Sequence, residues 1–384
     1  MSLIVDEHRQ YLEDQARVSA YREAIGEVVR PGGVVLDLGS GTGILGLLAC
    51  RAGAGRVYSI EEGGMIGLAR EVSRANGFEG RMVFVKGHST RVDLPEKVDV
   101  VVCDQIGRFG FEAGILQVFE DARRRFLKPG GSLIPSRIEL AVAPVECPEV
   151  WSQVEFWNSC PAGFDFRPAR QWAANTGYPV EFAAEQILGD PGTLTFLNLP
   201  EATAAPFRGE ACVVANKRGT LHGIGGWFTA QLSPSVTMTN SPLSADRIKR
   251  RNVFFPIDRP VELAPGDCVR ARLRIVPSEL IVTWKVEVLE GSQGQNGASP
   301  KARFSHSTLR GMLPTKEDLE RTQPQFVPKL SSWGKARRSI LELCDGNRPL
   351  SEIEQEVYRR HADLFRSPGE AAAFVAKVIN RYSL

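Results

Sequence analysis

The residues best suited to hold a ligand form one short run near the N-terminus. Asp37, Gly39, Gly41 and Gly43 alternate with other residues, directly after a short apolar run and directly before a longer one. Glycines permit a tight turn and let the backbone approach a ligand closely. A helix start offers free N–H groups to a negatively charged group. The run therefore predicts a strand, a ligand-binding turn and then a helix.

An acidic residue closes the next apolar run. Glu61 follows Val57-Tyr58-Ser59-Ile60 and stands eighteen residues past Gly43. A carboxylate at this position suits two ribose hydroxyls of a nucleotide cofactor. Dinucleotide-binding domains use the same arrangement, so the glycines alone leave a nicotinamide enzyme open.

The elements that must position these residues follow three successive patterns. Apolar runs alternate with helical patterns as far as Ile134, which predicts a parallel, doubly wound α/β sheet. Short alternating segments then predict antiparallel strands, and a helical pattern returns from Lys335. The expected segments are an N-terminal helical segment that covers the cofactor (1–30, with one helix over 6–30), a Rossmann-like domain (31–137), a β-barrel-like domain (138–310), a linker (311–334) and a small helical module (335–384).

Composition excludes several classes of protein. The chain is 43% hydrophobic and 24% charged with a formal net charge of +2, which argues against a general nucleic-acid binder. No apolar run reaches the roughly 18–20 residues that a membrane span requires. Seven cysteines lie scattered without metal-ligand spacing, and no secretion signal precedes them. We therefore expect reduced thiols, a cytoplasmic protein, no metal site, and no membrane or nucleic-acid partner.

The glycine run resembles a known family. An Asp before a GxGxG spacing resembles the class I methyltransferases, and residues 35–45 resemble the first motif of the protein arginine methyltransferases. Ala52-Gly53-Ala54 and the segment 127–135 are similar to that family too, and the resemblance covers roughly residues 6–290. It implies S-adenosylmethionine as cofactor, a Rossmann-like domain and a β-barrel-like domain behind it.

The resemblance also implies roles for single residues. Glu7-His8 and Leu12-x-Asp14-x-x-Arg17 match the family's N-terminal helix, where the arginine grips the methionine carboxylate and the histidine lies by the cofactor. An arginine fork suits a carboxylate physically. At the nucleoside end, the implied cofactor-binding residues are Glu61, Glu62, His88, Ser89 and Thr90, with Thr90 in the place of a family glutamate.

The acceptor loop departs from the family pattern. The family uses two glutamates after the fourth strand to hold a guanidinium group. Asp104 stands at the first position, whereas the second aligns with Ala113 and Glu112 lies one place earlier. Arg108 replaces an aromatic residue, and Arg247-Ile248-Lys249 replaces a threonine-histidine-tryptophan loop. Asp104 and Glu112 are the candidate catalytic residues, and the cations suit an acidic acceptor.

The C-terminal residues resemble a second family. Segments 340–346, 350–353 and 374–379 are similar to the small PqqD-like domains, which bind leader peptides through a winged-helix-like surface. Ser351 is a candidate helix N-cap. A structural cap on the barrel or a dimerisation element is the competing interpretation.

Three functions fit these observations. The first is an N-methyltransferase that acts on an arginine-like guanidinium of a peptide or natural-product precursor. The second is a methyltransferase for a small carboxylated or hydroxylated metabolite in natural-product biosynthesis, and the third is a non-catalytic cofactor-binding scaffold. A homodimer is also expected, with residues 154–190 as its dimerisation arm.

Overall fold

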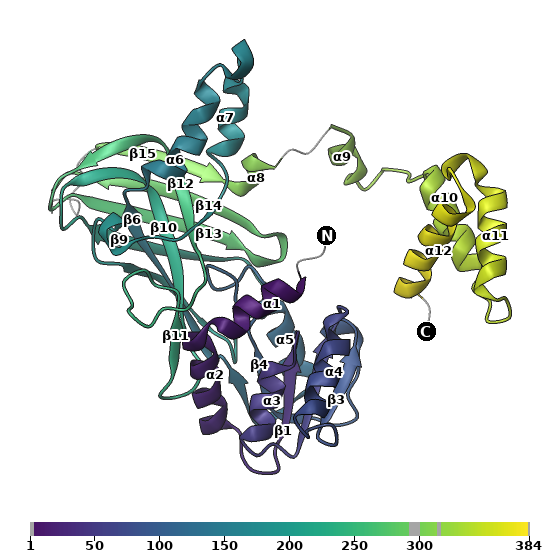
Figure 1. Ribbon diagram of the computed structural model, residues 1–384. Helices are drawn as coiled ribbons and strands as arrows, with labels where there is room; N and C mark the ends of the chain where they lie inside the picture. The colour runs from purple at the N-terminus through teal and green to yellow at the C-terminus, as the bar shows by residue number, and fades with distance from the viewer. Residues whose placement is uncertain (1–3, 292–299, 313–315, 383–384) are drawn as a thin grey trace. The chain divides into compact units, whose positions relative to one another are not determined.

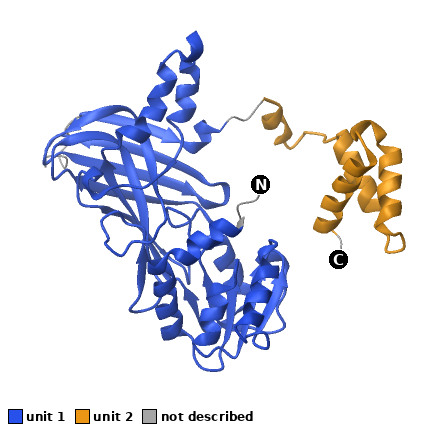
Figure 2. Cartoon of the chain, in the orientation of Figure 1, with its two compact units in different colours: residues 1–313 blue, residues 314–384 orange. Residues whose placement is uncertain are grey.

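The chain folds as two compact units. The computed structural model describes residues 4–291, 300–312 and 316–382. Unit 1 comprises residues 1–313 and unit 2 residues 314–384 (Figure 2). The first three residues of the predicted N-terminal segment and the last two of the C-terminal module lie outside the described residues. In the part of the chain described, no helix is long and apolar enough to span a membrane.

Unit 1 begins with a five-stranded parallel sheet in the order β3-β2-β1-β4-β5, which confirms the doubly wound prediction (Figure 1). Its strands bury apolar residues on both faces, as central parallel strands do. The order places β1 between β2 and β4, so the loops after these strands meet at one edge of the sheet. The elements are β1 (Val34–Leu38), α3 (Ile44–Arg51), β2 (Arg56–Glu61), α4 (Met65–Ala75), β3 (Met82–Lys86), β4 (Val98–Cys103), α5 (Ile115–Arg125) and β5 (Leu127–Ile134).

Two helices precede the sheet where a single helix over 6–30 was expected. The helix α1 (Ile4–Glu13) ends at Asp14, and α2 (Gln15–Val28) begins directly after it. The Asp14 carboxylate accepts a hydrogen bond from the N–H of Arg17, as an N-cap does. It also accepts one from the N–H of Lys249 at 2.7 Å. The prediction of one helix is wrong because Asp14 caps the second helix instead of continuing the first.

The second half of unit 1 consists of antiparallel strands, as predicted. One sheet has the order β7-β12-β10-β6-β8, with β11 beside β10, and the other has the order β15-β14-β13-β9. One apolar core runs from the parallel sheet into both antiparallel sheets. The strands are β6 (Arg137–Val145), β7 (Tyr178–Val180), β8 (Gly192–Asn198), β9 (Phe207–Val214), β10 (Gly219–Gln231), β11 (Thr237–Thr239), β12 (Asn252–Leu263), β13 (Cys268–Val276), β14 (Ile281–Leu289) and β15 (Ala302–Ser307).

Two helices project from the antiparallel part, and their bounds differ from those of the predicted arm. The helices α6 (Pro148–Glu155) and α7 (Arg167–Ala173) stand out together (Figure 1). The predicted arm of 154–190 includes α7 and the end of α6. Its last part includes β7, whose residues pair with β12 in the sheet.

The prediction of reduced thiols is wrong for two of the seven cysteines. Cys212 on β9 and Cys268 on β13 form a disulfide with a Cα–Cα distance of 6.4 Å. Their strands are antiparallel neighbours, and the register places Cys212 opposite Arg270, two residues from Cys268. The two cysteines are 56 residues apart in sequence, so only the strand pairing brings them together.

Unit 2 has its own apolar core. Its helices are α9 (Lys316–Arg321), α10 (Ser332–Leu343), α11 (Leu350–Arg360) and α12 (Pro368–Tyr382), after the short α8 (Thr308–Gly311) at the end of unit 1. Ile340, Ile353, Val357 and Val375 form the centre of the core that the last three helices share. Within residues 316–382 the structure contains helices and turns and no strand, so it shows no wing. Pro349, rather than Ser351, occupies the N-cap position of α11.

The separate core of unit 2 predicts an effect confined to that unit. Ile340→Ala removes a fully buried side chain, which costs roughly 2–5 kcal/mol, a large fraction of the stability of so small a unit. Hydrogen exchange followed by mass spectrometry should show faster exchange across α10–α12 and unchanged exchange in β1–β5.

The matched control is Leu341→Ala on the same helix, because Leu341 is 45% exposed. It should leave the exchange pattern unchanged. Equal acceleration in both units after Ile340→Ala would contradict the division into two cores.

Candidate functional site

One cavity of about 590 Å³ lies at the carboxyl edge of the parallel sheet. Four segments that are distant in sequence form its walls: α1 with the start of α2, the glycine loop after β1, the loop after β4, and the chain segment before β12. Its lining residues include His8, Tyr11, Asp14, Arg17, Gly39, Ser40, Gly41, Thr42, Asp104, Gln105, Arg108, Glu112, Lys249, Arg250 and Arg251. The sequence predicted most of the first three segments and Lys249 of the fourth, and the structure adds Arg250 and Arg251.

The glycine loop leaves room for a ligand beside its backbone. Gly41 has a φ of +51°, and a Cβ atom there would lie 2.5 Å from Cε1 of His8. A Cβ at Gly39 would lie 2.7 Å from the side-chain nitrogen of Gln105. The absent side chains therefore let His8 and Gln105 lie against the loop backbone, and the loop lines the cavity at Gly39 and Gly41. His8 lies directly over this loop.

Asp37 and Gly43 support the loop from behind and do not line the cavity. The Asp37 carboxylate is fully buried and accepts a hydrogen bond of 2.9 Å from the N–H of Gly46 at the start of α3. Its other oxygen has no partner among the described residues. Burial raises the pKa of Asp37 to about 7. Gly43 precedes α3 and lies against Ala69, so it permits close packing of helices.

The Glu61 carboxylate holds the same loop from the end of β2. One oxygen accepts from the N–H of Gly41 at 3.0 Å, and the other accepts from the N–H of Gly63 at 2.7 Å. Each oxygen keeps a further lone pair, so the group can accept hydroxyl donors as well. Glu62 is exposed and does not line the cavity.

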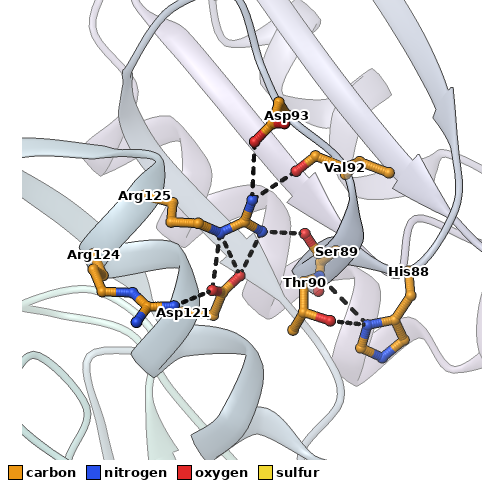
Figure 3. Close-up of polar contacts among 8 residues, drawn as sticks. All are labelled: His88, Ser89, Thr90, Val92, Asp93, Asp121, Arg124 and Arg125. Carbon is orange, nitrogen blue, oxygen red and sulfur yellow. Dashed lines mark hydrogen bonds and ion pairs between the residues drawn. The ribbon is translucent and has the colours of Figure 1, made fainter.

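The loop after β3 is held by an arginine that the sequence analysis missed. Arg125 on α5 donates to the backbone oxygens of Ser89 and Val92 and pairs with Asp121 at 2.6 Å (Figure 3). His88 and Thr90 join through a hydrogen bond of 2.7 Å between Nδ1 and the hydroxyl oxygen. Ser89 is buried, whereas His88 and Thr90 are exposed at the same sheet edge as the other loops. In the sequence, only the run of arginines at the end of α5 indicated that Arg125 could have such a role.

Asp104 is the centre of the polar groups behind the cavity. Its side chain is 10% exposed and accepts from Arg17 Nε at 2.6 Å, from Arg250 Nη2 at 3.0 Å and from the hydroxyl of Tyr21 at 3.1 Å. Burial alone would raise the pKa of Asp104, but the two guanidinium groups outweigh it and hold the pKa below its ordinary value. Asp104 is therefore an anion at neutral pH that already binds two guanidinium groups.

Glu112 does not face Asp104 as a second free carboxylate. Its oxygens accept from the N–H of Phe109 at 2.8 Å and from the N–H of Phe111 at 3.4 Å. Burial raises the pKa of Glu112, although these backbone hydrogen bonds act to lower it. The residue lines the cavity, but its charge is directed into its own loop. Glu112, which is shifted by one place in the sequence, therefore directs its carboxylate into its own loop rather than toward Asp104.

The arginines and lysines near the cavity differ in whether their side chains already have a partner. Arg250 was missed by the sequence analysis, which stopped at the neighbouring Lys249. Arg247 donates to the backbone oxygens of Phe182 and Pro242, so it does not line the cavity as expected. Arg108, Lys249 and Arg251 are among the residues that line it, and their side chains form no ion pair within the described part of the chain.

Comparisons with known proteins agree with this geometry. A family model described as a methyltransferase domain matches residues 30–183. Protein arginine N-methyltransferase 6 of Danio rerio is 28% identical over 71% of this chain and 82% of that protein. A probable protein arginine N-methyltransferase 6 of Arabidopsis thaliana is 31% identical over 72% of this chain and 63% of that protein.

A solved structure resembles a larger share of the chain. The Trypanosoma brucei PRMT1 enzyme–prozyme heterotetrameric complex with AdoHcy superposes with a TM-score of 0.70. The match covers 78% of this chain and 97% of that chain at 21% sequence identity. It establishes the fold of the parallel sheet together with the antiparallel domain.

The buried Asp37 carboxyl predicts a pH dependence of stability. The pKa of Asp37 is about 7 in the folded chain against an ordinary value of 3.8, so the folded state keeps a proton that the unfolded state releases. The free energy of unfolding of the parent, relative to Asp37→Asn, should fall as pH rises from about 4 to about 7 and then level off. Urea unfolding followed by circular dichroism at a series of pH values measures this difference. Parallel curves for the two proteins would show that the pKa of Asp37 is the same in the folded and the unfolded state.

Proposed function

We propose that this chain, an S-adenosylmethionine-dependent methyltransferase, methylates a nitrogen of an arginine-like guanidinium group on a peptide or natural-product precursor. The observation that supports this acceptor is the environment of Asp104. A single anionic carboxylate there binds the guanidinium groups of Arg17 and Arg250 within hydrogen-bonding distance. The position thus has the charge and geometry that a third guanidinium, from the acceptor, requires in place of Arg250.

The residues at the sheet edge suit S-adenosylmethionine, which supplies a methyl group activated on a sulfonium. The open backbone at Gly39 and Gly41 would accommodate the cofactor beneath His8. Arg17 has donors left for the methionine carboxylate, and Glu61 has acceptors left for the ribose hydroxyls. His88, Ser89 and Thr90, held by Arg125, would meet the adenine.

In this proposal the residues of the chain orient the acceptor more than they change its protonation. Asp104 attracts the cationic acceptor and holds it through N–H groups that do not react. Its negative charge also stabilises the cationic methylated product. Glu112 acts indirectly, because it holds the backbone of Phe109 and Phe111 within the loop whose residues Gly107, Arg108 and Ala113 line the cavity.

A second acceptor class has a specific observation in its favour. Arg108, Lys249 and Arg251 line the same cavity and form no ion pair within the described residues, although the charge of Arg108 acts to lower the pKa of Glu112. An acceptor that carries a carboxylate would satisfy them. A small carboxylated or hydroxylated metabolite is therefore the alternative, and it requires Arg250 to remain on Asp104 during turnover.

We also propose a homodimer in which the helices α6 and α7 contact a second copy. Phe156, Phe164 and Phe166 on this arm are 51%, 69% and 41% exposed. A hollow of about 340 Å³ on unit 1 is lined by apolar residues that include Leu47 and Leu68. The arm of one copy would contact the hollow of the other, because exposed apolar surface of this kind marks interfaces between proteins.

For unit 2 we propose the binding of a leader peptide, which rests on its resemblance to PqqD-like domains. The observation in favour is an exposed apolar group on α10 and α11, with Trp333, Leu341 and Leu350 each 44–45% exposed. A structural role for the three helices remains the competing interpretation. The cytoplasmic location expected from the sequence is likewise a proposal.

The position of Glu61 predicts a loss of cofactor affinity on its removal. Glu61→Ala deletes the acceptor of two ribose hydroxyls, at about 1.5–3 kcal/mol for each hydrogen bond to a charged group. The Kd for S-adenosylhomocysteine should rise at least about tenfold in a calorimetric titration. The control Glu79→Ala changes an exposed glutamate in the turn between α4 and β3 and should bind as the parent does. An unchanged Kd for Glu61→Ala would show that the end of β2 does not face the ribose.

The role of Asp104 predicts a larger effect on methyl transfer than on cofactor binding. Asp104→Asn keeps the shape and removes the charge, so kcat/KM for an arginine-containing peptide should fall about 10- to 100-fold. The exposed Asp246→Asn is the control for the same chemical change.

Radiolabelled methyl transfer and S-adenosylhomocysteine affinity are measured on the same preparations. If Asp104→Asn methylates guanidinium peptides at the parent rate, the guanidinium assignment is wrong. Methyl transfer only to a small carboxylic acid would then favour the second acceptor class. Cofactor binding without any methyl transfer would favour a non-catalytic, cofactor-binding scaffold.

A further inference from the structure

The outer face of the four-stranded antiparallel sheet carries an excess of positive charge. Side chains alternate between the two faces of a strand, so every second residue of β9, β13, β14 and β15 points outward. Six of the outward residues are cationic and two are acidic, a formal excess of four positive charges. This basic face consists of Arg208, Arg270, Arg272, Arg274, Lys285 and Arg303 with Glu210 and Glu287.

The strand register places like charges opposite each other. Arg274 on β13 pairs in register with Arg208 on β9, and Arg272 pairs with Lys285 on β14. Like charges directly opposite on neighbouring strands destabilise a sheet. A bound anion would remove this repulsion.

The two acids of the basic face are already shared among three arginines. Glu210 pairs with Arg272 at 2.8 Å and with Arg270 at 3.4 Å. Glu287 pairs with the same two arginines at 3.4–3.5 Å and with Arg303 at 3.1 Å. The remaining cations therefore depend on solvent or on a ligand.

Three exposed cations are left without an acid. Arg208, Arg274 and Lys285 form no ion pair within the described part of the chain, and all three are exposed. They surround an open hollow of about 720 Å³, together with Glu210 and Arg272. The hollow lies on the antiparallel domain, apart from the cavity at the edge of the parallel sheet.

We infer that this basic face docks an acidic, extended segment of a partner polypeptide. Alternate residues of a strand lie about 6.8 Å apart, so Arg270, Arg272 and Arg274 repeat at the distance that separates alternate carboxylates of an extended chain. The charges are complementary, and the open hollow gives the segment access. This inference goes beyond methyl transfer and does not depend on the proposed acceptor.

A nucleic acid fits the basic face less well. None of the outward residues of β9, β13, β14 and β15 in the register of the basic face is aromatic, so no platform stacks bases. Glu210 and Glu287 stand within the face and would repel a continuous phosphate backbone. A peptide can place a neutral or basic residue over each of them.

The test measures the binding of a fluorescein-labelled deca-glutamate peptide to the full chain by anisotropy at low and moderate salt. The patch variant combines Arg208→Gln, Arg274→Gln and Lys285→Gln. The control variant combines Arg30→Gln, Lys97→Gln and Lys329→Gln, which changes net charge equally at exposed positions elsewhere. Circular dichroism checks that both variants are folded, and deca-glutamine and a ten-nucleotide oligouridine serve as comparison ligands.

We expect the patch variant to lose at least tenfold in affinity for deca-glutamate, and the control variant to lose less than threefold. Affinity should fall as salt rises, because the attraction between exposed charges is screened. Equal losses in the two variants, or equal binding of deca-glutamine, would overturn the inference. Oligouridine binding that is as tight and depends on the same three side chains would overturn it in favour of a nucleic-acid site.

Discussion

The arrangement of unit 1 depends on the ion pairs and hydrogen bonds of one buried carboxylate, that of Asp104. It stands directly after β4, yet its partners come from α2 and from the segment before β12. A carboxylate with little exposure is stable as an anion only when cations and donors surround it. Arg17, Arg250 and Tyr21 supply them, so one charge joins the N-terminal helices, the parallel sheet and the antiparallel domain around a single cavity.

Asp104 and its two arginine partners also take part in the proposed methyl transfer. The cofactor is expected to use donors of Arg17, and the acceptor is expected to take the position of Arg250. The acceptor thus competes for a contact that holds Asp104, and the cofactor binds an arginine that donates to the same carboxylate. Binding of cofactor and acceptor are therefore expected to be coupled through Asp104, although their sites lie on different segments.

The parallel sheet, its glycine loop and the carboxylate at the end of β2 could be predicted from sequence because each depends on local pattern. Apolar runs, glycines and one acidic residue at a strand end carry that information. The break of the first helix at Asp14, the disulfide of Cys212 with Cys268 and the pairing of Arg250 with Asp104 depend on tertiary neighbours. No spacing within the chain reports them, and the direction of the Glu112 carboxylate into its own loop is of the same kind.

The most direct test of the central claim is to locate the transferred methyl group. The protein is incubated with S-adenosylmethionine and an arginine-containing peptide, and the product is fragmented in a mass spectrometer. The account predicts the mass of one or more methyl groups on the guanidinium of arginine, at a rate that depends on Asp104. A methyl group found only on a carboxylate, as a base-labile ester, would contradict it.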